Sequence, residues 1–182
     1  MDTNNPIIQW FGNDFSKLHP LIQDLHNKGG HLTGPVKISL GKGIAGVIGK
    51  RLALKLGIPT EQEFVELKVL IGHTDSSLIW NRTFNDSQEM KSTFVPNGVY
   101  PQGYWVENTG NIDLKLTVQI IDGGWHWIQQ GIKFRGISLP LWLIPKTTAY
   151  KQILNEKYVF SVSFSYPLLG ELLSYSGELI LD

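Results

Sequence analysis

The chain has 182 residues and a mass of 20.5 kDa, a size typical of a single domain with its own hydrophobic core. Hydrophobic residues make up 42% of the sequence and charged residues 18%, a balance that disfavours intrinsic disorder. Sixteen basic and sixteen acidic side chains give zero net charge, so we expect no nucleic-acid partner. The absence of cysteine excludes disulfides, thiolate nucleophiles and Cys-ligated metal sites.

The N-terminus lacks the features of a secretory signal. Asp2 stands where a signal peptide has positive charge, and no apolar run of ~7–15 residues follows it. The apolar run from Ile137 to Ile144 is interrupted by Ser138 and Pro140 and falls short of the ~20 residues that cross a bilayer. We therefore expect a cytoplasmic protein with no transmembrane segment.

Residues 1–58 predict helices around one strand. Apolar residues recur at helical spacing up to Lys28, and Pro20 places the start of this helix near His19. The alternation of apolar and polar residues over 36–40 predicts a strand. Residues 43–56 predict a second helix, and we expect its large apolar face to pack on the sheet: Ile44, Val47, Ile48, Leu52 and Leu56.

From Phe64 onward, nearly every segment alternates or is rich in β-branched and aromatic residues, with glycine and asparagine at the turns. The turns around Gly110, Gly123 and Asn155 are short enough to pair neighbouring strands antiparallel. Residues 138–145, which contain two prolines, predict an apolar crossover or lid loop. The predicted strands are 64–72, 77–84, 89–95, 102–107, 112–121, 124–134, 147–154, 157–166 and 171–181.

About nine to ten strands in a chain of this length favour curling or closure, because long open sheets expose unpaired edges. We predict an α+β fold that is mainly β: a strongly curved antiparallel sheet, either a half-barrel or a barrel, with one or two N-terminal helices. We expect a single domain over residues 1–182, with a helical part over about 1–58 and a β part over about 64–182.

The segment Gly41–Gly46 matches the glycine pattern of dinucleotide-binding proteins, between a predicted strand and a predicted helix. That pattern works in a parallel βαβ unit, whereas antiparallel hairpins follow it here. We therefore expect no cofactor. The five histidines show no metal-binding spacing, so we expect no metal site.

The zero net charge conceals a basic segment, because no Asp or Glu occurs between Leu25 and Thr60. The predicted helix at 43–56 is therefore amphipathic and cationic. Such a helix can lie on an anionic membrane surface. Packing against the sheet, with its lysines in solvent, is the favoured interpretation.

Trp80, Arg82 and Phe84 alternate on one predicted strand and share one face of the sheet. If that face lines a cavity, Arg82 can hold a carboxylate or phosphate of a ligand. The alternative is that Arg82 points to solvent or pairs with an acid such as Asp86, Glu89 or Glu107, and this alternative is favoured. For His126, a position on the surface or in the core is favoured over a catalytic role.

Several short motifs, in order and spacing, resemble a bacterial family catalogued as domain of unknown function 4166. They are Phe15-x-x-Leu18-His19-Pro20, Trp80-x-Arg82-x-Phe84, Ser92, Gly131-Ile132 followed by Leu139-Pro140 and Pro145, Pro167-x-x-Gly170 and Tyr175-x-Gly177. In that family the domain occurs alone or behind an NAD-binding, saccharopine-dehydrogenase-like domain, which implies service to a redox enzyme with an apolar substrate. The family has an acidic residue where this chain has Tyr150-Lys151, and the resemblance supplies no catalytic residue.

Three functional hypotheses follow, and a non-catalytic protein is favoured over an enzyme. The first is a binding module for a hydrophobic or lipid-like small molecule in the curved sheet, lined by Trp80, Arg82, Phe84, Trp105, Trp125, Trp127 and Trp142. The second is an accessory domain that docks on a separate NAD-dependent oxidoreductase, or on a membrane surface, through the basic region 37–55. The third is an enzyme with a dispersed site of Arg82, Glu107 and His126.

Overall fold

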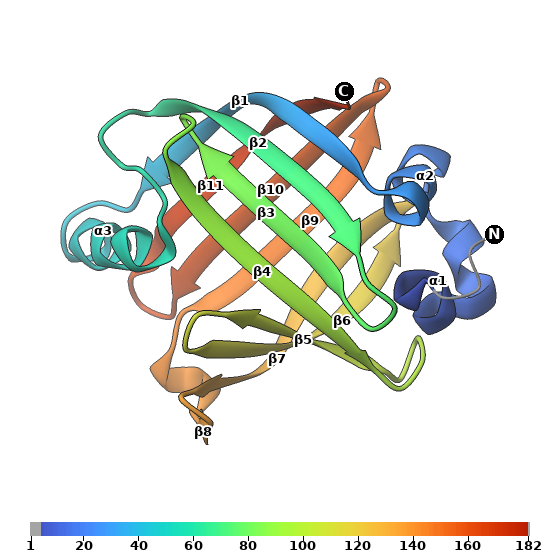
Figure 1. Ribbon diagram of the computed structural model, residues 1–182. Helices are drawn as coiled ribbons and strands as arrows, with labels where there is room; N and C mark the ends of the chain where they lie inside the picture. Colours follow the sequence, from blue (N-terminus) through green and yellow to red (C-terminus); the bar gives the residue numbers. More distant parts are fainter. Residues whose placement is uncertain (1–4, 182) are drawn as a thin grey trace.

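The computed structural model describes residues 5–181, which form a closed antiparallel β-barrel (Figure 1). Ten strands close the barrel in the order β6-β5-β4-β3-β2-β1-β11-β10-β9-β7, and β7 pairs back onto β6. The two-residue β8 extends the sheet beside β7. The strands are β1 (Gly30–Leu40), β2 (Phe64–His73), β3 (Leu78–Phe84), β4 (Gln88–Asn97), β5 (Tyr104–Thr109), β6 (Ile112–Ile121), β7 (Gly124–Phe134), β8 (Ile137–Ser138), β9 (Lys146–Leu154), β10 (Lys157–Tyr166) and β11 (Gly170–Leu181).

The predicted fold class is confirmed, and the nine strands predicted after residue 64 lie within two residues of their predicted bounds. The main difference is β1, which begins at Gly30 and not at residue 36. Gly34 and Pro35 interrupt its alternation in sequence. Gly34 is required there because a Cβ would lie 2.6 Å from the carbonyl oxygen of Glu178 on the neighbouring strand.

Three short helical segments cover one end of the barrel: α1 (Pro6–Phe11), η1 (Gly12–Lys17) and α2 (Pro20–Lys28). Helix α2 is the one predicted from sequence, and the His19 side chain caps it by accepting a hydrogen bond from the backbone of Leu21 at 3.2 Å. Helix α1 was not predicted. Its Trp10 carbonyl accepts a hydrogen bond from the backbone of Tyr100 in the β4–β5 connection, at 2.8 Å, which fixes α1 to the barrel.

Aromatic side chains seal this helix-covered end. The ring of Trp10 lies 5.3 Å from that of Trp105, and the ring of Phe11 lies 4.9 Å from that of Trp125. All four side chains are buried, and edge-to-face contacts of this kind add to the stabilisation from burial. The core therefore continues from the barrel interior into α1.

Helix α3 (Ile44–Leu56) packs beside β11 and β1 with a different face from the one predicted. Its small residues Ala45, Gly49 and Ala53 are buried, whereas Ile44, Val47 and Ile48 are exposed. The prediction that these three pack on the sheet is therefore wrong; Leu52 and Leu56 from the predicted face are partly buried against the core. The reason is a close backbone approach, since a Cβ on Gly49 would lie 1.9 Å from the carbonyl oxygen of Leu172.

The predicted crossover at 138–145 forms the end of β8 and the short helix η2 (Leu141–Leu143), outside the barrel. Within residues 5–181, no helix combines the length and the apolar character that crossing a bilayer requires.

Candidate functional site

A small cavity of about 30 Å³ lies inside the barrel, between β1, β2 and β3 on one side and β10 and β11 on the other. Trp80 and Arg82 of β3 reach it because alternate residues of a strand point to the same side. Tyr158 of β10 and Tyr175 of β11 line it from across the barrel, and aliphatic side chains complete the wall. The volume is about that of one water molecule.

Arg82 is held by a buried polar network. Its Nη1 donates to the hydroxyl of Tyr175 at 3.1 Å, its Nη2 contacts the Ser92 hydroxyl, and Oε1 of Glu107 lies 3.6 Å from Nη2. Burial alone would lower the pKa of Arg82, but Tyr175 and Glu107 raise it, so the net shift is upward and the guanidinium stays charged. The ion pair of Arg82 with Glu107 is therefore one of those predicted from the sequence as the alternative to ligand binding.

Three buried polar atoms around the cavity have no hydrogen-bond partner among the described residues. They are Nε1 of Trp80, Nε of Arg82 and the hydroxyl of Tyr158, and all three residues line the cavity. The two nitrogens can only donate, and burial raises the pKa of Tyr158, which keeps its hydroxyl protonated. The site therefore offers hydrogen-bond donors that lack an acceptor, an arrangement that is costly unless an acceptor fills it.

A second buried basic side chain, Lys151 of β9, lies next to this site. Its Nζ sits 4.3 Å from the centre of the Trp80 ring, 3.8 Å from that of Trp125, and contacts Nε2 of His26. The residue is 1% exposed, and no carboxylate within residues 5–181 forms an ion pair with it. Burial lowers the pKa of Lys151 well below its ordinary value, and burial together with Lys151 lowers the pKa of His26.

Sequence reasoning noted Lys151 only as a departure from the family pattern. A stronger signal was available, because Ala149, Lys151 and Ile153 share one face of β9 and the two apolar residues pack against the core. A lysine in such a stripe indicates an inward-facing charge.

The structure distributes the predicted lining residues among three environments. Trp80 and Arg82 line the cavity, and Phe84 is fully buried against Tyr175 with 5.9 Å between ring centres. The remaining interior tryptophans, Trp105, Trp125 and Trp127, pack on one another and on α1. Trp142 lies in η2 outside the barrel, 70% exposed.

The residues of the hypothetical dispersed enzyme site are not all brought together. Arg82 and Glu107 form an ion pair inside the barrel. His126 lies on the opposite face of its strand from the buried Trp125 and Trp127, where it stacks on Tyr150 with 5.4 Å between ring centres. Among the described residues, no group of three or more His, Asp or Glu side chains is placed to hold a metal ion.

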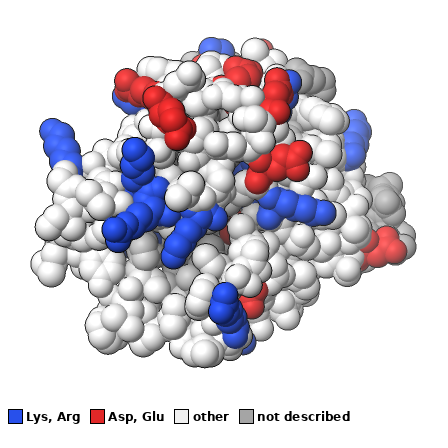
Figure 2. All heavy atoms as spheres, turned by 60° about the vertical axis from the view of Figure 1, so that its left-hand side comes forward, with Lys and Arg blue, Asp and Glu red and all other residues white. Residues whose placement is uncertain are grey.

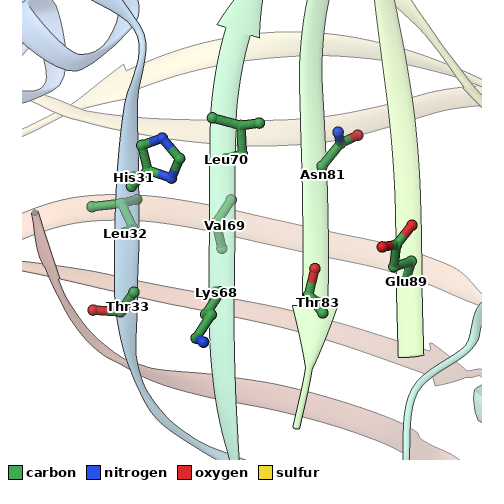
Figure 3. A pocket seen from close by; sticks show the side chains of 9 residues that line it. All are labelled: His31, Leu32, Thr33, Lys68, Val69, Leu70, Asn81, Thr83 and Glu89. Atoms are coloured by element: carbon green, nitrogen blue, oxygen red, sulfur yellow. The ribbon is translucent and has the colours of Figure 1, made fainter. Parts of the chain in front are cut away.

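A larger hollow of about 470 Å³ lies on the outer face of β1 to β4 (Figure 3). Seven of the labelled side chains lie on the outer face, in two rows that cross neighbouring strands: His31, Leu70 and Asn81, then Thr33, Lys68, Thr83 and Glu89. The other two, Leu32 and Val69, are buried and also line the interior cavity. Lys68 forms an ion pair with Asp86 at 2.7 Å. The lining is mostly polar and open to solvent, unlike the interior cavity.

Comparison with known proteins identifies the family. The model of the family described as Domain of unknown function (DUF4166) matches residues 18–179, from two residues before α2 into the last strand, β11. No curated protein matches the chain. The resemblance inferred from the sequence motifs is confirmed: the chain belongs to the DUF4166 family.

Proposed function

We propose that the barrel binds a hydrophobic, lipid-like small molecule, with the polar headgroup of that molecule at the cavity beside Trp80, Arg82 and Tyr158. The observation that carries the proposal is the set of three buried atoms without a hydrogen-bond partner at one cavity. A carbonyl or carboxylate oxygen is the acceptor that these donors lack. A carboxylate fits best, because the Arg82 guanidinium lines the site with Glu107 as its one ion-pair partner among the described residues, and a second basic side chain, Lys151, lies beside it.

The cavity holds a headgroup oxygen but not an acyl chain, so binding requires side chains to move apart. Such movement is expected at the end of the barrel opposite α1. There the inward-facing Leu114, Ala149 and Val162 are partly buried aliphatic side chains, whereas the rings of Trp10, Phe11, Trp105 and Trp125 fill the helix-covered end. The ligand therefore enters from the α3 end, and its chain replaces contacts among these aliphatic side chains.

The first experiment is native mass spectrometry of the gently purified protein, followed by organic extraction of any molecule that co-purifies. Binding of oleic acid and of oleyl alcohol, which has a similar chain but no carboxylate, is then measured by titration. We expect one molecule to bind per barrel, and oleic acid to bind at least tenfold more tightly than oleyl alcohol. This difference in affinity corresponds to about one hydrogen bond to a charged group.

Two conservative variants test the site, since Tyr158→Phe removes one hydroxyl and Trp80→Phe removes one indole N–H. Each is expected to weaken oleic acid binding about tenfold. The matched control is Tyr166→Phe, because the Tyr166 hydroxyl bonds to the carbonyl of Trp142 outside the barrel, at 2.9 Å. A protein that remains free of ligand after incubation with host lipids and oleic acid would overturn the proposal, as would unchanged binding by both variants.

A further inference from the structure

Three elements at one end of the barrel expose large apolar side chains to solvent. Helix α3 exposes Ile44, Val47 and Leu54, the β10–β11 turn exposes Leu168, and η2 exposes Trp142; Leu54 is 82% exposed and Leu168 fully so. We call these five residues the apolar tips. In Figure 1, α3, the β10–β11 turn and η2 all lie on the left, at the end opposite α1.

Contacts between the elements confirm that they are neighbours. Helix α3 packs on β11, where its Gly49 lies against the carbonyl of Leu172, two residues into that strand. Tyr166 ends β10 at the same turn, and its hydroxyl donates to the Trp142 carbonyl of η2 at 2.9 Å. The apolar tips therefore form one surface and are not scattered.

The orientation of α3 makes this exposure a fixed feature of the fold. The helix is seated through Ala45, Gly49 and Ala53, which recur every four residues and allow close backbone contact. Ile44, Val47, Arg51, Leu54 and Lys55 then fall on the opposite face at helical spacing. Turning the large residues inward would drive their side chains into the backbone of β11.

Unpaired positive charge lies on and just before helix α3, beside the apolar tips of that helix. Lys42, Lys50, Arg51 and Lys55 are exposed, and none of the described carboxylates forms an ion pair with them. No acidic residue occurs between positions 25 and 60. Figure 2, with this end of the barrel brought forward, shows Lys and Arg side chains gathered among uncharged surface, while the acidic side chains lie mainly above them.

We propose that this end of the barrel docks on the surface of an anionic lipid bilayer. The apolar tips enter the boundary between headgroups and acyl chains, and the four basic side chains lie at the level of the lipid phosphates. Trp142 is suited to this boundary because its indole is apolar with one polar edge. A protein partner is a poorer fit, since the cores of protein interfaces are depleted in lysine and these lysines alternate with the apolar tips.

This inference does not depend on ligand binding in the barrel. The two are spatially related, because the docked end is also the end at which we propose that the ligand enters. A bilayer at this end would place the opening of the barrel next to the phase in which a lipid-like molecule dissolves.

Vesicle sedimentation tests the proposal with two lipid compositions, pure phosphatidylcholine and a 70:30 mixture of phosphatidylcholine and phosphatidylserine. We expect the protein to pellet with the anionic vesicles at least tenfold more than with the neutral ones, and to be released at high salt. Quenching of tryptophan fluorescence by brominated lipid is expected as well, and Trp142→Phe should abolish most of it because the other described tryptophans are buried or half-buried.

Paired variants separate the two contributions. The double variant Lys50→Gln with Lys55→Gln should weaken binding to anionic vesicles more than tenfold. The double variant Val47→Ser with Leu54→Ser should weaken binding more than tenfold to both the neutral and the anionic vesicles. The matched control for charge is Lys157→Gln at the start of β10, at the helix-covered end, and the control for apolar exposure is Ile180→Ser, which is 66% exposed on β11. Thermal unfolding verifies that every variant is folded.

The proposal is overturned if wild-type protein fails to pellet with anionic vesicles, or if both pairs of variants bind as well as their controls. Self-association of the protein through this surface without vesicle binding would also overturn it, and would assign the apolar tips to a protein interface.

Discussion

The two ends of the barrel use large apolar residues in opposite ways. At the end covered by α1 and α2, Trp10 and Phe11 point into the barrel and pack on Trp105 and Trp125. At the other end, α3 turns its small residues to the sheet and its large ones to solvent. The first arrangement adds to the core, and the second leaves apolar area available for contact with something else.

The difference shows that helix length and apolar content do not decide which face a helix buries. The distance between backbones decides it. Helix α1 lies across the open end of a barrel, where bulky rings have space to fill, whereas α3 lies directly against the β11 backbone and has room for a glycine only. Stability should therefore respond strongly to large residues at one end and weakly at the other.

The largest expected effect is at the helix-covered end. Trp10→Ala should lower the free energy of unfolding by about 3–5 kcal/mol, because it removes a buried aromatic ring and leaves a cavity among the rings of Phe11, Tyr100 and Trp105. Urea denaturation monitored by circular dichroism measures this change. The matched control is Trp142→Ala at the other end, which should change stability by less than about 0.5 kcal/mol. Equal losses for both variants would contradict the comparison.

The next effect concerns the buried amine. Lys151→Met should stabilise the protein by roughly 1–3 kcal/mol near neutral pH, because an apolar side chain replaces an amine whose charged form is disfavoured by burial.

This gain should depend on pH. The folded pKa of Lys151 lies below its ordinary value of 10.5, so between these two values the unfolded chain holds one more proton than the folded chain. Wild-type stability should therefore rise with pH across this window, by up to about 1.4 kcal/mol per unit, and the penalty should be complete below the folded pKa. Urea denaturation of Lys151→Met and wild type from pH 6 to 10 should show the advantage of the variant shrinking toward pH 10.

Lys133→Met, at an exposed position of β7, is the control and should show no such trend. If Lys151→Met is less stable than wild type at every pH, the contacts of the amine with the Trp80 and Trp125 rings outweigh its desolvation, and the assignment of Lys151 as an uncompensated charge is incorrect.

Sequence alone was sufficient to predict the positions of the nine barrel strands after residue 64. Their alternation reflects a local rule, because successive side chains of a strand face opposite sides of the sheet, and the short turns force antiparallel pairing. Strand β1 was truncated in the prediction because Gly34 and Pro35 break the alternation, although their roles depend on the neighbouring β11.

The candidate site was only partly predictable. The spacing of Trp80 and Arg82 placed both on one face, but the partners of Arg82 come from β4, β5 and β11, and only the folded barrel brings these together. Lys151 meets Trp80 across the barrel in the same way, whereas Trp125 lies directly opposite it on the neighbouring strand β7. The buried face of α3 was predicted incorrectly because the prediction considered only the spacing of the large apolar residues. The small residues Ala45, Gly49 and Ala53, which also recur at helical spacing, form the face in contact with β11.

The smallest expected effect tests that reading of α3 directly. Gly49→Ala should lower the free energy of unfolding by about 1–2 kcal/mol, because the strain of a Cβ against the Leu172 carbonyl exceeds the better helix propensity of alanine, worth at most about 1 kcal/mol. Gly72→Ala on β2 is the matched control, since a Cβ there meets no atom within 4 Å. If Gly49→Ala instead stabilises the protein, α3 is not seated on β11 through its small residues, and the exposure of Ile44, Val47 and Leu54 loses its explanation.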